Sequence, residues 1–318
     1  MIYLLFAIGF VLLIKGADYL VDGASSIAKK FKISSLVIGL TIVAFGTSAP
    51  ELVVNLLASF KGSSDLAVSN IVGSNIANML LILGVAAVVY PLKVKSNTVW
   101  KEIPLSLLAI VLAFVMANDV IFDGAMVNTI SRVDGIGLIA FFIIFMYYSF
   151  GMAKNTEEDG EEITELATSK SVAYILIGMV GLTLGGKWIV DGAVFIAKSF
   201  SMSEALIGLT VVAIGTSLPE LATSYVAARR KNADIAIGNT VGSNIFNVFW
   251  ILGLSSIVRP LPFDAANNNE DMYLAILASL LLFVFMFFGR KQVLQRSQGV
   301  FFLLLYFGYM IFKVVTNV

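Results

Sequence analysis

The sequence contains no cysteine and no histidine. The chain therefore cannot form disulfides, use a thiol nucleophile or an imidazole base, or hold zinc or haem through their usual ligands. Charged residues are also scarce, at 13% of the 318 residues, whereas soluble domains carry about 25%. Any chemistry that the protein performs must rely on oxygen atoms of side chains and backbone.

Hydrophobic residues make up 58% of the chain, which is typical of a polytopic membrane protein. The first apolar run lacks a preceding basic segment and continues into polar sequence, so it predicts a transmembrane helix and not a cleaved signal peptide. Lys plus Arg and Asp plus Glu both number 21, so net charge is uninformative about partners. The expected surroundings are a lipid bilayer, and no nucleic-acid partner is expected.

Hydropathy predicts an all-α membrane protein with ten transmembrane helices, each near the roughly 20 residues that cross about 30 Å of hydrocarbon. The predicted helices are 2–25, 34–60, 66–90, 102–118, 133–151, 171–197, 203–228, 234–258, 271–289 and 298–314. Helices 2 and 7 contain the polar sequence GTS-x-PE, and helices 3 and 8 contain GSNI-x-N. We expect these four helices to be broken.

The two halves of the chain repeat at an offset of 169 residues, since 220 − 51 = 169 pairs Glu51 with Glu220. The repeat runs without a gap from about Gly16/Gly185 to Leu92/Leu261. Each copy holds five spans, an odd number, so the second copy must be inverted relative to the first. We predict a first repeat at 1–153, an acidic cytoplasmic linker at 154–170 and a second repeat at 171–318.

The distribution of basic residues predicts the orientation. With both termini outside, the cytoplasmic loops receive most of the Lys and Arg residues, as the positive-inside rule requires. The loop after the second span, KGSSD, corresponds to RRKNAD after the seventh, so positive charge changes sides as inversion demands. The predicted location is the cytoplasmic membrane of a prokaryote.

Each half carries a glutamate beside a proline in an apolar segment, and a carboxylate at that depth indicates a functional site. Pro50 and Pro219 lack an N–H, so the carbonyls four residues earlier lose their helical partners. Spacings of three and four residues align hydroxyl, amide and carboxylate oxygens on one helix face. The candidate side chains are Thr47, Ser48, Glu51, Ser74 and Asn78 in the first half, and Thr216, Ser217, Glu220, Ser243 and Asn247 in the second.

This set offers only oxygen ligands, which suit hard cations such as Ca²⁺, Na⁺ or Mg²⁺. If the halves converge, Glu51 and Glu220 supply two negative charges, which match one Ca²⁺. Mg²⁺ fits less well, because it demands near-octahedral geometry and retains its waters. Inverted repeats with discontinuous helices are the architecture of secondary transporters.

Other polar residues have simpler interpretations. Asn75 and Asn244 are expected to bond the backbone near the breaks and not the ion. Lys15 with Asp18 or Asp22, and Lys187 with Asp191, are expected to form interfacial ion pairs, with a gating contact as the alternative. Asp134, before a glycine and an apolar run, predicts a helix start.

The paired sequences AFGTSAPE…SNIVGSNIAN and AIGTSLPE…GNTVGSNIFN resemble the two α-repeats of the cation/calcium antiporter superfamily, and most of all those of prokaryotic sodium/calcium exchangers. The resemblance covers essentially the whole chain. It implies ten helices in two inverted halves, with helices 2, 3, 7 and 8 around the site and helices 1 and 6 sliding against them.

The resemblance also implies ligand positions, with Ca²⁺ between the two glutamates and Na⁺ in overlapping and flanking subsites. Those positions are Ala44 (carbonyl), Thr47, Ser48, Glu51, Ser74, Asn78, Ala213 (carbonyl), Thr216, Ser217, Glu220, Ser243 and Asn247. Ca²⁺ and Na⁺ are then substrates that compete for one site. No resident cofactor is expected, and the oligomeric state is left open.

Three alternatives remain at this point. Both glutamates are protonatable, so a proton-coupled cation antiporter is one. Potassium-dependent exchange is another, although Asn78 and Asn247 stand where some such relatives carry Asp. A channel fits an enclosed acidic site less well than a carrier. An enzyme is not expected, because the chain lacks His, Cys and a GxGD motif.

Overall fold

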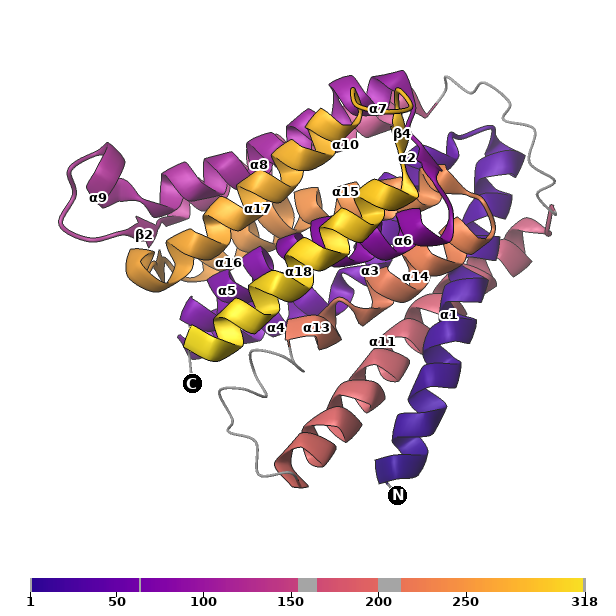
Figure 1. Cartoon of the computed structure of the whole chain (residues 1–318), viewed down its shortest axis with the longest axis horizontal. Coiled ribbons are helices and arrows are strands. Elements are labelled where there is room, and N and C mark those ends of the chain that lie inside the picture. The colour runs from indigo at the N-terminus through magenta and orange to yellow at the C-terminus, as the bar shows by residue number, and fades with distance from the viewer. Residues whose placement is uncertain (1, 63, 154–164, 200–212, 317–318) are drawn as a thin grey trace.

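The computed structural model describes residues 2–62, 64–153, 165–199 and 213–316, which are almost entirely helical (Figure 1). The helices of the first half are α1 (Ile2–Phe31), α2 (Ser35–Ile38), η1 (Gly39–Val43), α3 (Ala44–Thr47), α4 (Ala49–Lys61), α5 (Ser64–Ile76), η2 (Ala77–Ile82), α6 (Leu83–Val89), α7 (Ser96–Trp100), α8 (Glu102–Ala117), α9 (Asp119–Phe122) and α10 (Arg132–Met152). Those of the second are α11 (Thr168–Ser199), α13 (Ala213–Thr216), α14 (Leu218–Arg229), α15 (Ala233–Ile245), η4 (Phe246–Leu252), α16 (Gly253–Val258), α17 (Ala265–Phe285) and α18 (Arg296–Thr316).

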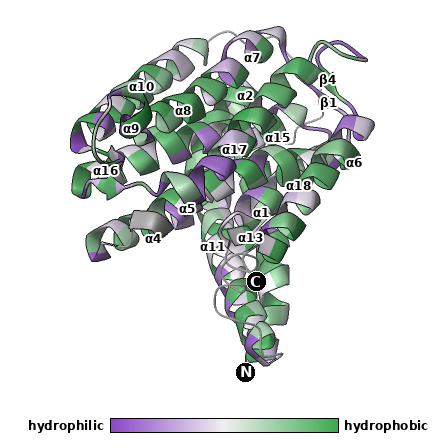
Figure 2. Ribbon diagram, turned by 60° about the vertical axis from the view of Figure 1, so that its left-hand side comes forward, coloured by the Kyte–Doolittle hydropathy of each residue, from purple (hydrophilic) through white to green (hydrophobic). Residues whose placement is uncertain are grey.

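Eight helices in the described part of the chain are long and apolar enough to cross a membrane, and a ninth span results if the bent pair at 35–61 counts as one. The expected span at 203–228 lies partly outside the described residues, as does most of the predicted linker at 154–170. Hydrophobic residues cover most of α8 and α18 (Figure 2), and large apolar side chains such as Ile143 and Leu304 are exposed. The chain is therefore an all-helical, multi-pass membrane protein.

Some helix boundaries differ from the hydropathy prediction. Helix α1 continues to Phe31, and α17 begins at Ala265, six residues before its predicted start. At the start of α17 the Asp264 carboxylate accepts a hydrogen bond from the backbone N–H of Ala266 (3.0 Å). Hydropathy detects only the apolar part of a helix, so capped polar turns outside it are missed.

Helices 3 and 8 are not broken, contrary to the prediction. Residues 64–89 and 233–258 are continuous helices that each contain a π-helical segment, η2 and η4. The two π segments correspond to each other at the 169-residue offset, since 246 − 77 = 169. A π segment widens the helix without ending it, and such segments occur often at functional sites.

Two pairs of two-residue strands, each far apart in the sequence, lie next to the ends of helices. Strand β1 (Leu92–Lys93) pairs antiparallel with β4 (Val293–Leu294), and β2 (Thr129–Ile130) pairs with β3 (Leu261–Pro262). Each pairing connects the first half of the chain to the second. The sequence analysis did not predict them, because two-residue strands carry no periodic pattern.

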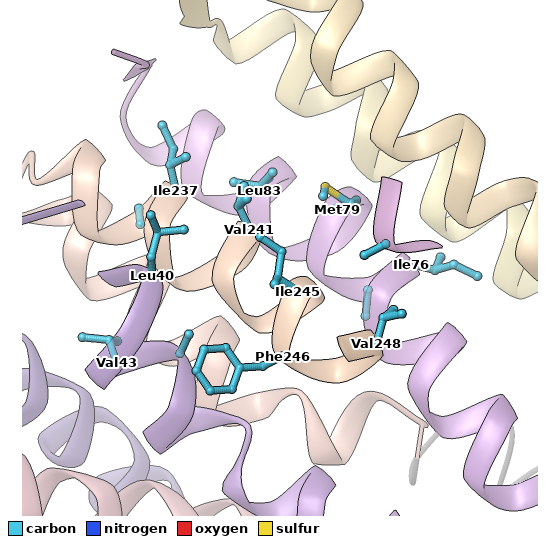
Figure 3. Packing of buried hydrophobic residues seen from close by; sticks show 14 of the residues in the cluster. Leu40, Val43, Ile76, Met79, Leu83, Ile237, Val241, Ile245, Phe246 and Val248 are labelled. Atoms are coloured by element: carbon cyan, nitrogen blue, oxygen red, sulfur yellow. The ribbon is translucent and has the colours of Figure 1, made fainter. Parts of the chain in front are cut away.

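The centre of the molecule forms around α15, which packs against segments of both halves. Figure 3 shows core side chains from η1, η2 and η4 gathered about this helix. The backbones approach closely, because a Cβ added to Gly238 would lie 2.8 Å from the Leu36 carbonyl oxygen, and one added to Gly242 would lie 2.8 Å from that of Leu40. Glycine at both positions lets α15 approach the helix that carries the first candidate motif.

Helices α1 and α11 lie side by side and run antiparallel, apart from the main bundle at their far ends (Figure 1). Their contact uses small residues that repeat every seven positions, which is how helices approach closely in membranes. The facing pairs are Gly9 with Gly185, Gly16 with Gly178, and Gly23 with Ser171.

We expect Gly178→Ala to destabilise the protein by about 1–3 kcal/mol, the usual cost of overpacking. A Cβ at this position would lie 2.7 Å from the Leu20 nitrogen and 2.8 Å from the Gly16 carbonyl oxygen, so the two backbones must separate. Thermal unfolding in detergent measures the effect. Gly308→Ala is the matched control, because no atom lies within 4 Å of its added Cβ. Equal unfolding temperatures for both variants would contradict the close packing.

Candidate functional site

The two GTS-x-PE motifs interrupt their helices in the same way. Ser48 separates α3 from α4 with φ −85° and ψ 7°, and Ser217 separates α13 from α14 with φ −88° and ψ 6°. In the first half the helices on either side meet at 48°. Pro50 and Pro219 lie in the first turn of the following helix, where their missing N–H costs no helical bond. The predicted breaks of helices 2 and 7 are confirmed.

Each break places a glutamate in the first turn of a helix inside the protein. Glu51 and Glu220 are both only 1% exposed, and their carboxylates are close enough to repel each other. The positive end of the helix dipole favours a carboxylate at this position. Two buried negative charges at one place nevertheless carry a desolvation cost that only a cation or protons can offset.

Hydroxyl groups lie near both carboxylates, and most of them come from the opposite half of the chain. Ser48 Oγ donates a hydrogen bond to Glu220 Oε1 (2.8 Å), and Thr47 and Ser243 lie near the same carboxylate. Thr216 lies near Glu51. The two halves therefore converge on one site, as the sequence analysis expected if they acted together.

Many oxygen atoms at this place are buried but have no hydrogen-bond partner among the described protein groups. Most buried polar atoms in proteins are paired, so such a cluster needs an explanation. Groups of three or more His, Cys, Asp or Glu residues that could bind a metal are absent from the described residues. The unpartnered oxygens on predicted site residues are Glu51 Oε2, Ser74 Oγ, Asn78 Oδ1, Ser217 Oγ, Glu220 Oε2, Ser243 Oγ and Asn247 Oδ1.

Of the remaining predicted site residues, Ala44, Thr47, Ser48 and Thr216 already have partners. Thr47 Oγ1 donates to Asn239 Oδ1 (3.0 Å) and lies 3.2 Å from the Ala44 carbonyl oxygen. That carbonyl also accepts the backbone N–H of Ser48 (2.9 Å), so it is not free as the resemblance implied. Ala213 begins α13 at the edge of the described residues.

Asn75 and Asn244 were expected to bond the backbone. Their side-chain oxygens instead accept hydrogen bonds from the opposite half. Asn78 Nδ2 donates to Asn244 Oδ1 (2.9 Å), and Asn247 Nδ2 donates to Asn75 Oδ1 (3.0 Å). The expectation was wrong because it considered partners within one half, whereas these side chains lie at the interface between halves.

The sequence analysis assigned no role to a second asparagine pair, Asn70 and Asn239. Asn239 accepts from Thr47, and Asn70 Oδ1 lies 3.4 Å from Thr216 Oγ1. Both asparagines belong to the 169-residue repeat, and that repetition was the signal that could have identified them. They orient the threonine hydroxyls of the opposite half.

The charged residues at the helix ends behave mostly as predicted. Lys15 and Asp18 form an ion pair of 3.8 Å, and Asp134 completes a capping box with Ser131 at the start of α10. The unpredicted partner is Arg230, just after α14, which binds Asp18 (2.9 Å) and also Asp22. No ion pair joins Lys187 to Asp191 in the described part of the chain.

Comparison with known proteins gives consistent matches over nearly the full length. A family model described as sodium/calcium exchanger protein matches residues 1–151 and 170–315. A solved structure of the sodium-calcium exchanger NCX_Mj, soaked with 10 mM Na⁺ and zero Ca²⁺, superposes with a TM-score of 0.83 at 34% identity, covering 96% of this chain and 98% of that one.

Two curated relatives are similar over comparable lengths. Sodium/calcium exchanger MaX1 of Methanosarcina acetivorans is 33% identical, with 97% of each chain covered. Inner membrane protein YrbG of Escherichia coli (strain K12) is 38% identical, with 93% of this chain and 91% of the relative covered.

Proposed function

Because this chain belongs to the sodium/calcium exchanger family, a family of transporters and not of enzymes, we propose that it is a secondary active antiporter. It exchanges Na⁺ for Ca²⁺ across the cytoplasmic membrane by alternating access around the site of Glu51 and Glu220. Calcium leaves the cell while sodium enters down its gradient.

The observation that carries this proposal is that seven buried oxygens of the predicted ligands, one on each of the two carboxylates and five on hydroxyl or amide groups, have no partner among the described protein groups. Two negative charges match one Ca²⁺, and hydroxyl and amide oxygens complete the irregular coordination that Ca²⁺ accepts. Na⁺ uses oxygen ligands of the same kind, so both ions compete for one set of groups. Competition for one site leads to exchange and not to cotransport.

We propose all twelve positions as ligands, including Ala44, Thr47, Ser48 and Thr216, whose oxygens already have partners in this conformation. Ion binding at Ala44 requires Thr47 to give up its weaker contact with that carbonyl, 3.2 Å long. The proposed ligands are Ala44, Thr47, Ser48, Glu51, Ser74, Asn78, Ala213, Thr216, Ser217, Glu220, Ser243 and Asn247.

Helices α1 and α11 correspond to each other in the 169-residue repeat, and their antiparallel arrangement supports inversion of the second repeat relative to the first. We propose five helices in each repeat, ten in all. The basic residues support both termini on the outside. The halves also differ in detail, as alternating access requires. Ser48 donates to Glu220, whereas its counterpart Ser217 has no partner among the described groups. Thr47 is fully buried, whereas Thr216 is partly exposed.

The test is calcium flux into proteoliposomes with gradients of Na⁺, K⁺ and H⁺ imposed one at a time. We expect an outward Na⁺ gradient alone to drive uptake of radioactive calcium, and we expect the uptake to saturate with calcium concentration. Flux driven by a pH gradient alone would replace the proposal by proton-coupled exchange, and a strict need for K⁺ would replace it by potassium-dependent exchange. Non-saturating flux would indicate a channel.

Arg230 links α14 to α1 and must release it if α1 slides during transport. Its partners Asp18 and Asp22 are 31% and 42% exposed, so the contact contributes at most about 1 kcal/mol, or about a five-fold change in populations. We expect Arg230→Gln to increase the population of the alternative conformation by up to this factor.

Spin labels on Lys30→Cys in α1 and Tyr225→Cys in α14 would measure that population through their distance distribution, since the chain has no other cysteine. Arg229→Gln is the matched control, because Arg229 is exposed and has no ion pair in the described residues. An unchanged distribution in Arg230→Gln would show that the contact does not hold α1 in this position.

A further inference from the structure

Two amide–amide hydrogen bonds cross between the halves, on segments that pack against the helices of the two glutamates: η2 against α14, and η4 against α4. Asn78 Nδ2 donates to Asn244 Oδ1 (2.9 Å), and Asn247 Nδ2 donates to Asn75 Oδ1 (3.0 Å). The bonds are equivalent under the repeat, because 78 + 169 = 247 and 75 + 169 = 244. All four side chains are at least 97% buried.

Each bond fixes which end of an amide faces the ion. An asparagine side chain has one oxygen acceptor and one NH₂ donor on opposite branches, and the two branches exchange places when the group turns over. Asn244 Oδ1 is an acceptor, so the NH₂ of Asn78 turns toward it. The oxygen of Asn78 then points the other way, where it has no partner among the described protein groups.

The same geometry holds at Asn247, whose oxygen is also buried and has no partner in the described part of the chain. An amide that was free to turn would have to be oriented by the cation itself, whereas an amide held with its oxygen toward the ion is already ordered for binding. We propose that Asn75 and Asn244 are positioning residues that hold the amide oxygens of Asn247 and Asn78 toward the ion. This inference rests on the proposed function, since it assumes that the amide oxygens bind Ca²⁺.

The helix geometry brings these groups together. Asn75 and Asn78 are three residues apart, so both lie on neighbouring parts of one helix face. The π segments η2 and η4 begin one residue before Asn78 and Asn247. Each half therefore supplies one ligand amide and one positioning amide, and neither half can orient its own ligand.

A third asparagine pair gives a matched control. Asn118 and Asn269 also join two helices by amide hydrogen bonds, of 3.0 and 2.9 Å, but neither carries a predicted ligand oxygen. Removing Asn118 costs a partly buried hydrogen bond of the same chemical kind. It has no ligand amide to misorient.

The experiment measures the calcium dependence of sodium-driven uptake in proteoliposomes for Asn244→Ala and Asn118→Ala. For Asn244→Ala we expect the KM for Ca²⁺ to rise about ten-fold, because the ion must then orient the Asn78 amide itself, with the maximal rate within about two-fold. For Asn118→Ala we expect an unchanged KM and a lower unfolding temperature. Equal KM values in the two variants would overturn the proposal.

Asn78→Asp separates orientation from packing, because a carboxylate presents oxygen on both branches and needs no orienting partner. In that background we expect Asn244→Ala to change the KM by less than about two-fold, against ten-fold in the unaltered protein. An equal rise in both backgrounds would assign Asn244 a purely structural role. Asn75→Ala, which acts through Asn247, replaces Asn244→Ala if the latter does not fold.

Failure of this inference is distinguishable from failure of the proposed function. If the unaltered protein shows no sodium-driven calcium uptake, the proposed function is wrong. If it shows such uptake and Asn244→Ala leaves the KM unchanged, only the positioning role is wrong.

Discussion

Glu220→Gln and Glu51→Gln are each expected to reduce sodium-driven calcium uptake at least about 100-fold, because one charge cannot offset the dehydration of a divalent ion and about 3 kcal/mol is lost. Glutamine has the same shape, and at position 220 its amide oxygen can still accept from Ser48 Oγ. The variants should therefore remain folded while they lose transport. Initial rates of calcium uptake into proteoliposomes measure the effect.

Glu102→Gln is the matched control for both variants. Glu102 is fully buried, lies at the start of α8 and accepts a hydrogen bond from Tyr148, but it belongs to a different part of the protein. Its replacement tests whether loss of any buried carboxylate stops transport. Undiminished uptake in both site variants, or an equal loss in Glu102→Gln, would refute the assignment of Glu51 and Glu220.

The double variant Glu51→Gln/Glu220→Gln is expected to be more stable than the unaltered protein in the absence of ions, by about 2 kcal/mol, within the range found when buried charges are replaced. The two carboxylates repel each other and are almost completely buried. Removing both charges removes the repulsion and most of the desolvation cost. Thermal unfolding in detergent with a calcium chelator measures this gain.

Calcium should reverse the order of stability. A ligand that binds only the folded state stabilises it in proportion to its affinity, so the unaltered protein should gain stability on adding Ca²⁺ and the double variant should gain none. If the double variant unfolds at a lower temperature in chelator, the two carboxylates are partners in the fold and not a strained ion site.

The predictable part of the site was the part repeated along the chain. Pro50 and Pro219 mark the two breaks because a missing N–H is a local property, and Glu51 with Glu220 stand out because carboxylates are rare in apolar segments. The structure confirms both breaks and places each glutamate in the first turn of the helix that follows. Helix ends were less predictable: the capped turn after Asp264 is polar and lies outside the apolar stretch.

The unpredictable part lies between the halves. Asn75 was expected to bond the backbone because only neighbours along the chain can be identified from sequence, yet its partner is Asn247, in the other half. Arg230 was not paired with Asp18 for the same reason. Helix 3 was expected to break at its polar motif, but a π segment accommodates Asn78 within a continuous helix.

The sequence by itself determined the membrane class, the repeat and the oxygen-only chemistry, because composition, spacing and the absence of His and Cys are properties of the chain alone. Only the tertiary structure decided which oxygens are paired and which are not. That distinction depends on contacts between residues about 170 positions apart, such as Ser48 with Glu220. The 169-residue repeat identifies the candidate ligands, and the packing of the halves leaves seven of their oxygens without a partner among the residues that the structure describes.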